Sequence, residues 1–207
     1  MLLLGLITSP VEVIIYLLIL VLALTVHEAA HAYMAHLLGD DTAKHMGRLT
    51  LNPLAHLDLW GSILMLVAGF GWGKPVMVNP LHFENPKLDN ITVALAGPVS
   101  NFLLACLLGL LIRFIPMPAL IQSGLALGVL LNLTLMVFNL LPIPPLDGSK
   151  FLTLFLKDTT YLYFEQFGFY ILMALIIFDT QIPVIPFILN HVVSFIFNFL
   201  VGHPISL

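Results

Sequence analysis

Two histidines and a glutamate near the N-terminus have the spacing of a zinc-binding pattern. Residues 27–31 read His-Glu-Ala-Ala-His, and on a helix the side chains of His27 and His31 would lie on one face. Two imidazoles placed in this way can bind one zinc ion, with Glu28 beside them as a general base. The alternative is a polar helix end that matches the pattern by chance.

The pattern lies inside an apolar run from Pro10 to Leu38. A run of this length can cross a bilayer as a helix. Carboxylate and imidazole side chains are costly inside a membrane-spanning helix, so they are usually functional there. We therefore interpret His27, Glu28 and His31 as part of a site.

The composition indicates an integral membrane protein. Of the 207 residues, 60% are hydrophobic and 9% are charged, whereas about a quarter of the residues of a soluble domain are charged. The apolar runs are continuous rather than alternating, which argues against a transmembrane β-barrel. No basic patch indicates nucleic acid, no cleavable signal peptide is evident, and the single cysteine, Cys106, excludes an intrachain disulfide.

We predict an all-α polytopic membrane protein with about five transmembrane helices, forming one domain over residues 1–207. The expected spans cover residues 10–38, 90–115, 120–141, 164–178 and 184–201. The apolar run at residues 60–70 is too short to cross, so we interpret it as a re-entrant or interfacial segment. Val76 and Val78 alternate within residues 74–81, and the flanking prolines would confine a strand there to an edge. This segment is the predicted membrane-associated β element.

The basic residues predict the orientation of the chain. With residues 60–70 re-entrant, one side of the membrane carries most of the cations: Lys44, Arg48, Lys74, Lys87, Lys150 and Lys157. Arg113 lies on the other side. The positive-inside rule places the basic side in the cytoplasm, with the N-terminus outside and the C-terminus inside.

A catalytic zinc ion usually has three protein ligands, so another part of the chain must supply the third. Asp147 is the strongest candidate, because three prolines at 142, 144 and 145 break the preceding helix and Gly148 permits a turn. A broken helix at membrane depth is tolerated where it lines a cavity. The alternative is an ordinary interfacial loop. The other side chains weighed as ligands are His36, His45, His56, Asp58, His82, Asp179, His191 and His203.

His56 and Asp58 have a spacing that would suit a second metal or proton-relay site. Such residues more often belong to a polar loop, and we favour that interpretation.

Four motifs together resemble the site-2 protease family of intramembrane zinc metalloproteases. The first is the pattern at residues 27–31, and the second is Asn-x-x-Pro-x-Pro-x-Leu-Asp-Gly at residues 139–148. The third is Ala-Gly-Pro-Val-Ser-Asn at residues 96–101. The fourth is Gly-Arg-Leu-Thr-Leu-Asn-Pro at residues 47–53, which is typical of the short bacterial members. The resemblance covers residues 10–157.

The resemblance implies one Zn²⁺ ion held by His27, His31 and Asp147, with Glu28 as the catalytic base. It also implies that Asn139 is an oxyanion donor or a substrate contact. Asn101 is a weaker candidate for substrate binding. Close helix packing at the Gly-Pro pair before Asn101 is an equal alternative.

The family fold implies a catalytic core made of the first three predicted spans, over residues 10–157, with C-terminal helices at residues 164–202 outside it. A small sheet between the first two spans would include the predicted strand. Many members carry a PDZ or CBS domain, and some carry a span before the zinc-motif helix. We expect neither in this chain, so a regulatory membrane protein would replace such domains.

The expected activity is hydrolysis of peptide bonds within or near transmembrane segments, in regulated intramembrane proteolysis or in clearance of signal-peptide remnants. A helix hides its carbonyl groups, so the substrate must unwind locally, and strand addition at Val76 and Val78 would hold it extended. The expected partners are a transmembrane protein substrate and the lipid bilayer, and no nucleic acid. Two alternatives are a membrane metal transporter, which does not require Glu28, and an inactive relative that acts as a binding module.

Overall fold

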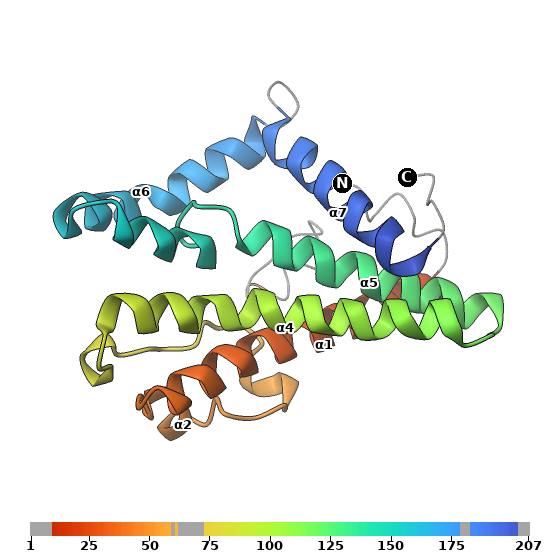
Figure 1. Ribbon diagram of the computed structural model, residues 1–207, viewed down its shortest axis with the longest axis horizontal. Helices are drawn as coiled ribbons and strands as arrows, with labels where there is room; N and C mark the ends of the chain where they lie inside the picture. Colours follow the sequence, from red (N-terminus) through yellow and green to blue (C-terminus); the bar gives the residue numbers. More distant parts are fainter. Residues whose placement is uncertain (1–9, 59–60, 62–72, 179–182, 203–207) are drawn as a thin grey trace.

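The structure is a computed structural model that describes residues 10–58, 61, 73–178 and 183–202 (Figure 1). Within these residues the helical elements follow in the order α1 (Pro10–Leu37), α2 (Thr42–His45), η2 (Pro53–Ala55), η3 (Pro80–His82), α4 (Pro86–Phe114), α5 (Ala119–Asn139), η4 (Asp147–Leu154), α6 (Asp158–Ile177) and α7 (Val184–Val201).

Four of these helices are long and apolar enough to cross a membrane: residues Val13–Leu37 of α1, then α4, α5 and α6. The helix Ile185–Val201 is apolar but shorter. The prediction of a helical, multi-pass membrane protein is therefore confirmed. The count of five spans stays a prediction, because α7 is shorter than the other four.

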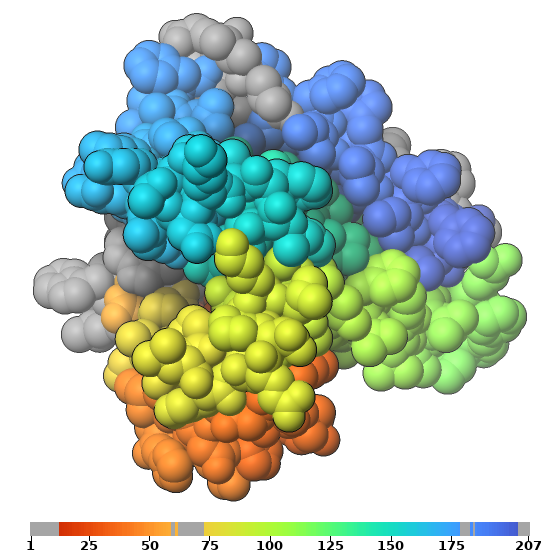
Figure 2. Space-filling model, turned by 60° about the vertical axis from the view of Figure 1, so that its left-hand side comes forward, coloured from red at the N-terminus to blue at the C-terminus, as the bar shows by residue number. Residues whose placement is uncertain are grey.

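Helix α4 lies at the centre of the bundle and packs against both α1 and α5 (Figure 1). Tyr16 and Leu20 of α1 are buried against Leu131 of α5, because the apolar faces of the helices meet there. Helix α7 covers the other side of α4 and α5, where Phe197 is 1% exposed. Figure 2 shows the N-terminal part of α4 lying between the α1–α2 segment and the segment that contains η4 and the start of α6.

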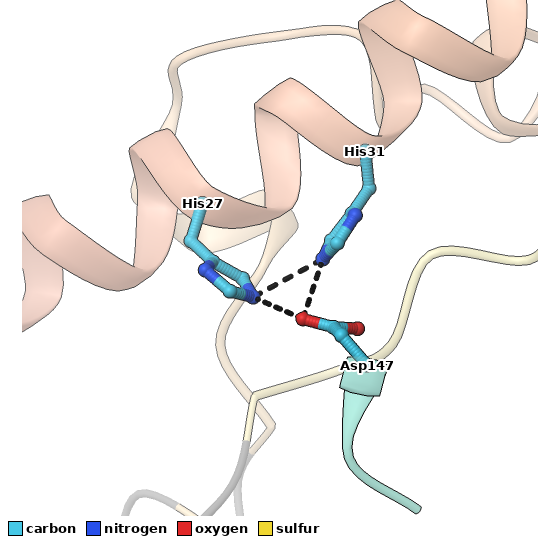
Figure 3. Close-up of side chains that lie close together, drawn as sticks. All are labelled: His27, His31 and Asp147. Atoms are coloured by element: carbon cyan, nitrogen blue, oxygen red, sulfur yellow. Dashed lines mark hydrogen bonds and ion pairs between the residues drawn. The ribbon is translucent and has the colours of Figure 1, made fainter. Parts of the chain in front are cut away.

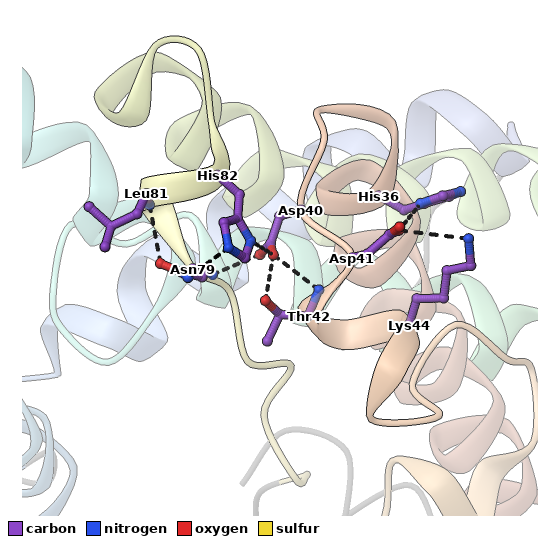
Figure 4. A network of polar contacts seen from close by, with 8 residues as sticks. All are labelled: His36, Asp40, Asp41, Thr42, Lys44, Asn79, Leu81 and His82. Carbon is purple, nitrogen blue, oxygen red and sulfur yellow. Dashed lines mark hydrogen bonds and ion pairs between the residues drawn. The ribbon is translucent and has the colours of Figure 1, made fainter.

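The end of α1 is joined to the loop before α4 by one buried carboxylate (Figure 4). Asp40 is 0% exposed; its Oδ1 accepts hydrogen bonds from the Thr42 backbone N–H at 3.0 Å and from His82 Nδ1 at 2.8 Å. Its Oδ2 accepts one from the Asn79 backbone N–H at 2.7 Å. Burial by itself raises the pKa of Asp40, but the hydrogen bonds from Thr42, Asn79 and His82 outweigh burial and lower this pKa to about 2. The carboxylate thereby fixes where α4 begins relative to the end of α1.

The two ends of the described chain lie at the same end of the bundle. A Cβ atom on Gly124, near the start of α5, would lie 3.8 Å from the side chain of Ile15 of α1. At the C-terminal end of α7, the carbonyl of Phe199 accepts a hydrogen bond from Arg113 Nη1 at 3.3 Å, and Arg113 closes α4. The predicted topology, with the N-terminus outside and the C-terminus inside, stays a prediction, because residues 1–9 and 203–207 lie outside the described residues. Figure 1 shows that α6 rises away from the bundle and that α7 returns to it at an angle. Helix α7 therefore ends beside the C-terminal end of α4.

The predicted β element is not confirmed. Residues 74–79 have no regular secondary structure, and η3 follows directly. Among the described residues, the nearest feature is an isolated antiparallel bridge between Leu57 and Gly73. The prolines at 75 and 80 supply no backbone N–H, so they interrupt a hydrogen-bond ladder at both ends of this segment. The predicted re-entrant segment at residues 60–70 lies, apart from Gly61, outside the described residues.

Candidate metal centre

Three side chains from two distant parts of the chain meet at one point (Figure 3). The Nε2 atoms of His27 and His31 are 3.1 Å apart. Asp147 Oδ2 lies 3.2 Å from the first of these atoms and 3.4 Å from the second. Within the part of the chain that the structure describes, these residues form the one group of histidine, cysteine and acidic side chains placed to hold a metal ion.

The other ring nitrogens of the two histidines are both occupied by acceptors on α4. Nδ1 of His31 lies 2.8 Å from the backbone carbonyl of Val93, and a carbonyl can only accept, so this Nδ1 carries the proton. Nδ1 of His27 lies 2.6 Å from Oδ1 of Asn101, so it likewise donates. In neutral imidazoles both Nε2 atoms then present lone pairs. This is the arrangement that metal-binding histidines have, with the second nitrogen held by an outer partner.

Two lone pairs and a carboxylate oxygen at such short range repel one another unless a cation lies between them. Asp147 Oδ2 is buried and receives no hydrogen bond from the other described residues. A tetrahedral zinc ion bound at about 2.0 Å by each ligand separates the ligand atoms by about 3.3 Å, which matches the 3.1–3.4 Å observed between the three atoms. Two imidazoles and one carboxylate make three protein ligands, the number typical of catalytic zinc, whose fourth position is taken by water or substrate. The residues therefore fit Zn²⁺.

Gly97 allows α4 to approach the two histidines. A Cβ atom at this position would lie 2.6 Å from Cε1 and Nε2 of His27, and closer still to Nε2 of His31. Val93, Gly97 and Asn101 are spaced by four residues and so form one face of α4. On this face, Asn101 and the Val93 carbonyl accept the hydrogen bonds of the two Nδ1 atoms, and Gly97 lies against both rings. Close helix packing, which the sequence left as one of two alternatives for the Gly-Pro pair, is what the structure shows for Gly97.

Asp147 reaches the histidines because the chain leaves the helix after Asn139. The three prolines that follow cannot continue the helix, and Asp147 opens the 3₁₀ turn η4. Gly148 packs directly on the carbonyl of Leu140, where a side chain would not fit. Three residues after Asp147, Lys150 Nζ donates to Glu165 Oε1 of α6 at 2.7 Å. The turn that carries Asp147 is therefore held by the packing of Gly148 on Leu140 and by the ion pair of Lys150 with Glu165.

Glu28 lies one residue from the first histidine, and its side chain is half-buried. Its Oε1 lies close to the backbone of Gly73, 3.9 Å from where a Cβ atom on that glycine would stand. It makes no hydrogen bond or ion pair with the described residues that would neutralise it.

The structure places the other predicted site residues differently. Asn101 is completely buried, and its amide bonds His27, the Ala23 carbonyl and Asn132, so it has no surface for a substrate. Asn139 Nδ2 donates to the Leu135 carbonyl at 3.0 Å, one turn back on its own helix. Val76 and Val78 are half-buried, and Val78 packs against the cluster around Phe83. The substrate or oxyanion roles of Asn139, Val76 and Val78 stay predictions.

The remaining polar candidates have structural partners. His56 is 1% exposed, and its Nε2 donates to the Thr50 carbonyl at 2.8 Å. Asp58 Oδ1 accepts the Gly61 N–H at 2.9 Å. His36 pairs with Asp41, and His191 bonds the Phe187 carbonyl at 2.8 Å. None of them joins a second metal group within the described residues. Asp179 and His203 lie outside these residues.

Two supporting residues were missed by sequence reasoning. Asn132 is an amide within the apolar α5, and an amide in a membrane-spanning helix is a signal that could have found it. Lys150 was noted as a charge but not as a partner of Glu165, because nothing in the sequence places α6 beside η4.

The fold and the site together define a multi-pass membrane protein in which two histidines and an aspartate could hold a metal ion, a donor set that zinc peptidases use. Comparison with known proteins agrees. The model of "Peptidase family M50" matches residues 116–178. The chain is 50% identical over 151 residues to the Bacillus subtilis protein named "Putative zinc metalloprotease YwhC", a match that covers 68% of this chain and 69% of the relative.

A Mycolicibacterium smegmatis protein named "Putative zinc metalloprotease Rip2" is 36% identical over 166 residues, which cover 75% of this chain and 64% of that relative. A Methanocaldococcus jannaschii protein named "Putative zinc metalloprotease MJ0611" is 37% identical over 92 residues, 44% of this chain and 48% of the relative. No solved structure matches the chain significantly. The chain therefore belongs to peptidase family M50, the site-2 protease family of zinc metalloproteases.

Proposed function

We propose that this protein hydrolyses peptide bonds within or next to the transmembrane segments of other membrane proteins. The observation that carries the proposal is the meeting of His27, His31 and Asp147 in one cation site, with Glu28 on the next helical position. Two of these ligands lie inside a helix long enough to span a membrane. A site at this depth is reached most directly by a substrate that is itself in the bilayer.

The residues of the chain divide the chemistry between them. When bound, Zn²⁺ supplies a Lewis acid that activates water and polarises the carbonyl to be cleaved. Glu28 takes the proton that the water loses as its oxygen forms the new bond to the carbonyl carbon. The same carboxyl group returns that proton to the amine nitrogen as the C–N bond breaks. His27, His31 and Asp147 hold their positions throughout, because each is fixed by a partner on α4 or by the turn of η4.

The proposed setting is a bacterial cell membrane with the basic end of the bundle in the cytoplasm. Lys87 at the start of α4 and Asp158 at the start of α6 form an ion pair of 2.6 Å, so the starts of these helices share one end. Arg113 lies at the other end, with the end of α7. The positive-inside rule then orients the bundle. We further propose that a regulatory membrane protein controls access and that the substrates belong to regulated proteolysis or signal-peptide clearance.

The test is Glu28→Gln in full-length protein. The substitution keeps the shape of the side chain but removes the base, so zinc content should stay at one ion per chain while cleavage is lost by a factor of about 100 or more. Quantitative proteomics of membranes from cells that carry either form should show membrane-bound stubs accumulating with Glu28→Gln.

Glu84→Gln is the matched control, because Glu84 is an exposed acid outside the helices. It should leave the membrane proteome as in the wild type. Equal stub levels with wild type and Glu28→Gln, at equal expression, would rule out the proteolytic function.

A further inference from the structure

Two buried asparagine amides connect His27 to the central part of α5. Asn101 of α4 and Asn132 of α5 are both 0% exposed. Asn101 Oδ1 lies 2.6 Å from His27 Nδ1, and Asn101 Nδ2 donates to Asn132 Oδ1 at 2.9 Å. Asn132 Nδ2 donates in turn to the Gly128 carbonyl at 2.9 Å. The chain of hydrogen bonds thus joins α1, which carries both histidines, to α4 and α5.

The direction of this chain is set by backbone carbonyls, which can only accept. Because the Gly128 carbonyl faces Asn132, the amide of Asn132 must turn its nitrogen to that carbonyl and its oxygen to Asn101. Asn101 must then turn its nitrogen to the oxygen of Asn132, and the Ala23 carbonyl, 3.3 Å from Asn101 Nδ2, favours the same direction. Asn101 therefore turns its oxygen to His27, and Nδ1 of this histidine has to carry the proton.

We propose that Asn101 and Asn132 are positioning residues that hold His27 in the tautomer whose Nε2 lone pair can bind the metal. The inference rests on the proposed zinc chemistry but concerns residues outside the ligand set. Asn132 touches neither the metal position nor a ligand, and it acts through Asn101. His31 needs no such relay, since the Val93 carbonyl holds its Nδ1 directly.

Loss of Asn132 should act on the histidine two hydrogen bonds away. Asn132→Leu removes the nearer acceptor of Asn101 Nδ2. Among the described residues, the more distant Ala23 carbonyl then remains as the acceptor for that nitrogen. The amide of Asn101 can then turn over and present its nitrogen to His27 Nδ1. The ring proton moves to Nε2 in that state, which blocks the metal-binding atom.

The experiment uses the full chain in detergent, with Zn²⁺ alone as the probe. Zinc affinity is measured by competition with a chromophoric chelator, and the His27 tautomer by ¹⁵N NMR of histidine-labelled protein. Changes to outer partners of metal-bound histidines cost about 10–100-fold in affinity. We expect a loss of about tenfold for Asn132→Leu and of about 100-fold for Asn101→Leu, with a larger share of the Nε2–H tautomer in the metal-free protein of both.

Asn101→Asp should restore both the zinc affinity and the His27 tautomer relative to Asn101→Leu, because either carboxylate oxygen can accept the hydrogen bond from His27 Nδ1. Thr25→Val is the matched control: Thr25 is 1% exposed and donates to the Val21 carbonyl of its own helix at 2.7 Å. This substitution removes a buried polar group near the site and should change zinc affinity less than twofold.

Each outcome decides between the proposals. If the wild type itself binds no zinc, the proposed function fails. If the wild type binds one ion, and Asn132→Leu and Asn101→Leu bind it equally well, only the relay is overturned. Weaker binding without a change of tautomer would show a packing role and would also overturn the relay. Should Asn101→Leu fail to fold, Asn132→Leu and Asn101→Asp still give the decision.

Discussion

Gly97→Ala sets two physical effects against each other. Gly97 lies inside α4, and replacing glycine by alanine in a helix interior normally stabilises the fold by about 1 kcal/mol. Here the added Cβ would lie 2.6 Å from two ring atoms of His27 and closer still to His31. Carbon atoms in contact are about 3.5–4.0 Å apart, so the His27 ring would have to retreat by about 0.9 Å and the His31 ring by more. Metal–ligand distances are tolerated within about 0.2 Å. The clash should therefore dominate at the metal centre.

We expect Gly97→Ala to weaken zinc binding by a factor of at least about 100, the upper end for changes beside metal-bound histidines. The assay is chelator competition together with thermal unfolding in detergent, each with and without zinc. Gly124→Ala in α5 is the control: a Cβ there would meet Ile15 at 3.8 Å, an ordinary contact, so zinc affinity should stay unchanged. A Gly97→Ala protein that is more stable than the wild type and binds zinc equally well would refute the account of how α4 supports the rings.

Two further predictions concern the supports of the site. The pKa of Asp40 is about 2 in the folded protein against a usual 3.8, so the stabilisation by this carboxylate is complete above about pH 4 and is lost as the pH falls toward 2. Asp40→Asn should lower the melting temperature at pH 6 and flatten the decline of the melting temperature between about pH 4 and pH 2. An unchanged decline would contradict the stabilising role of the Asp40 carboxylate. Gly168→Ala should push α6 away from the segment of three prolines, because the added Cβ would lie 2.5 Å from the Pro144 carbonyl oxygen. Overpacking of this kind costs about 1–3 kcal/mol of folding stability. Differential scanning fluorimetry that shows no loss of stability would contradict this prediction.

The local features of this protein follow from its sequence. The positions of the helices follow from continuous apolar runs, since a backbone in lipid must satisfy its own hydrogen bonds and a helix does so within one segment. The pair His27 and His31 follows from helical periodicity, which is a local property. Asp147 could be predicted as a partner because three closely spaced prolines, at 142, 144 and 145, lack the backbone N–H groups that would continue the preceding helix.

The tertiary structure decided the features that depend on contacts between distant segments. The strand predicted at residues 74–81 needed a neighbouring strand, and the described chain offers a single bridge instead. The side on which α7 ends depends on the angle at which it meets α6, which periodicity does not encode.

Around the metal centre the same distinction holds. The sequence indicated two ligands and a candidate third, but it did not show that Gly97 leaves room for both rings or that Asn101 faces His27. Nor did it show that Asn132 fixes the direction of that amide. Such roles arise only when α1, α4 and α5 pack together, because a hydrogen bond between helices depends on their relative position and not on spacing along the chain.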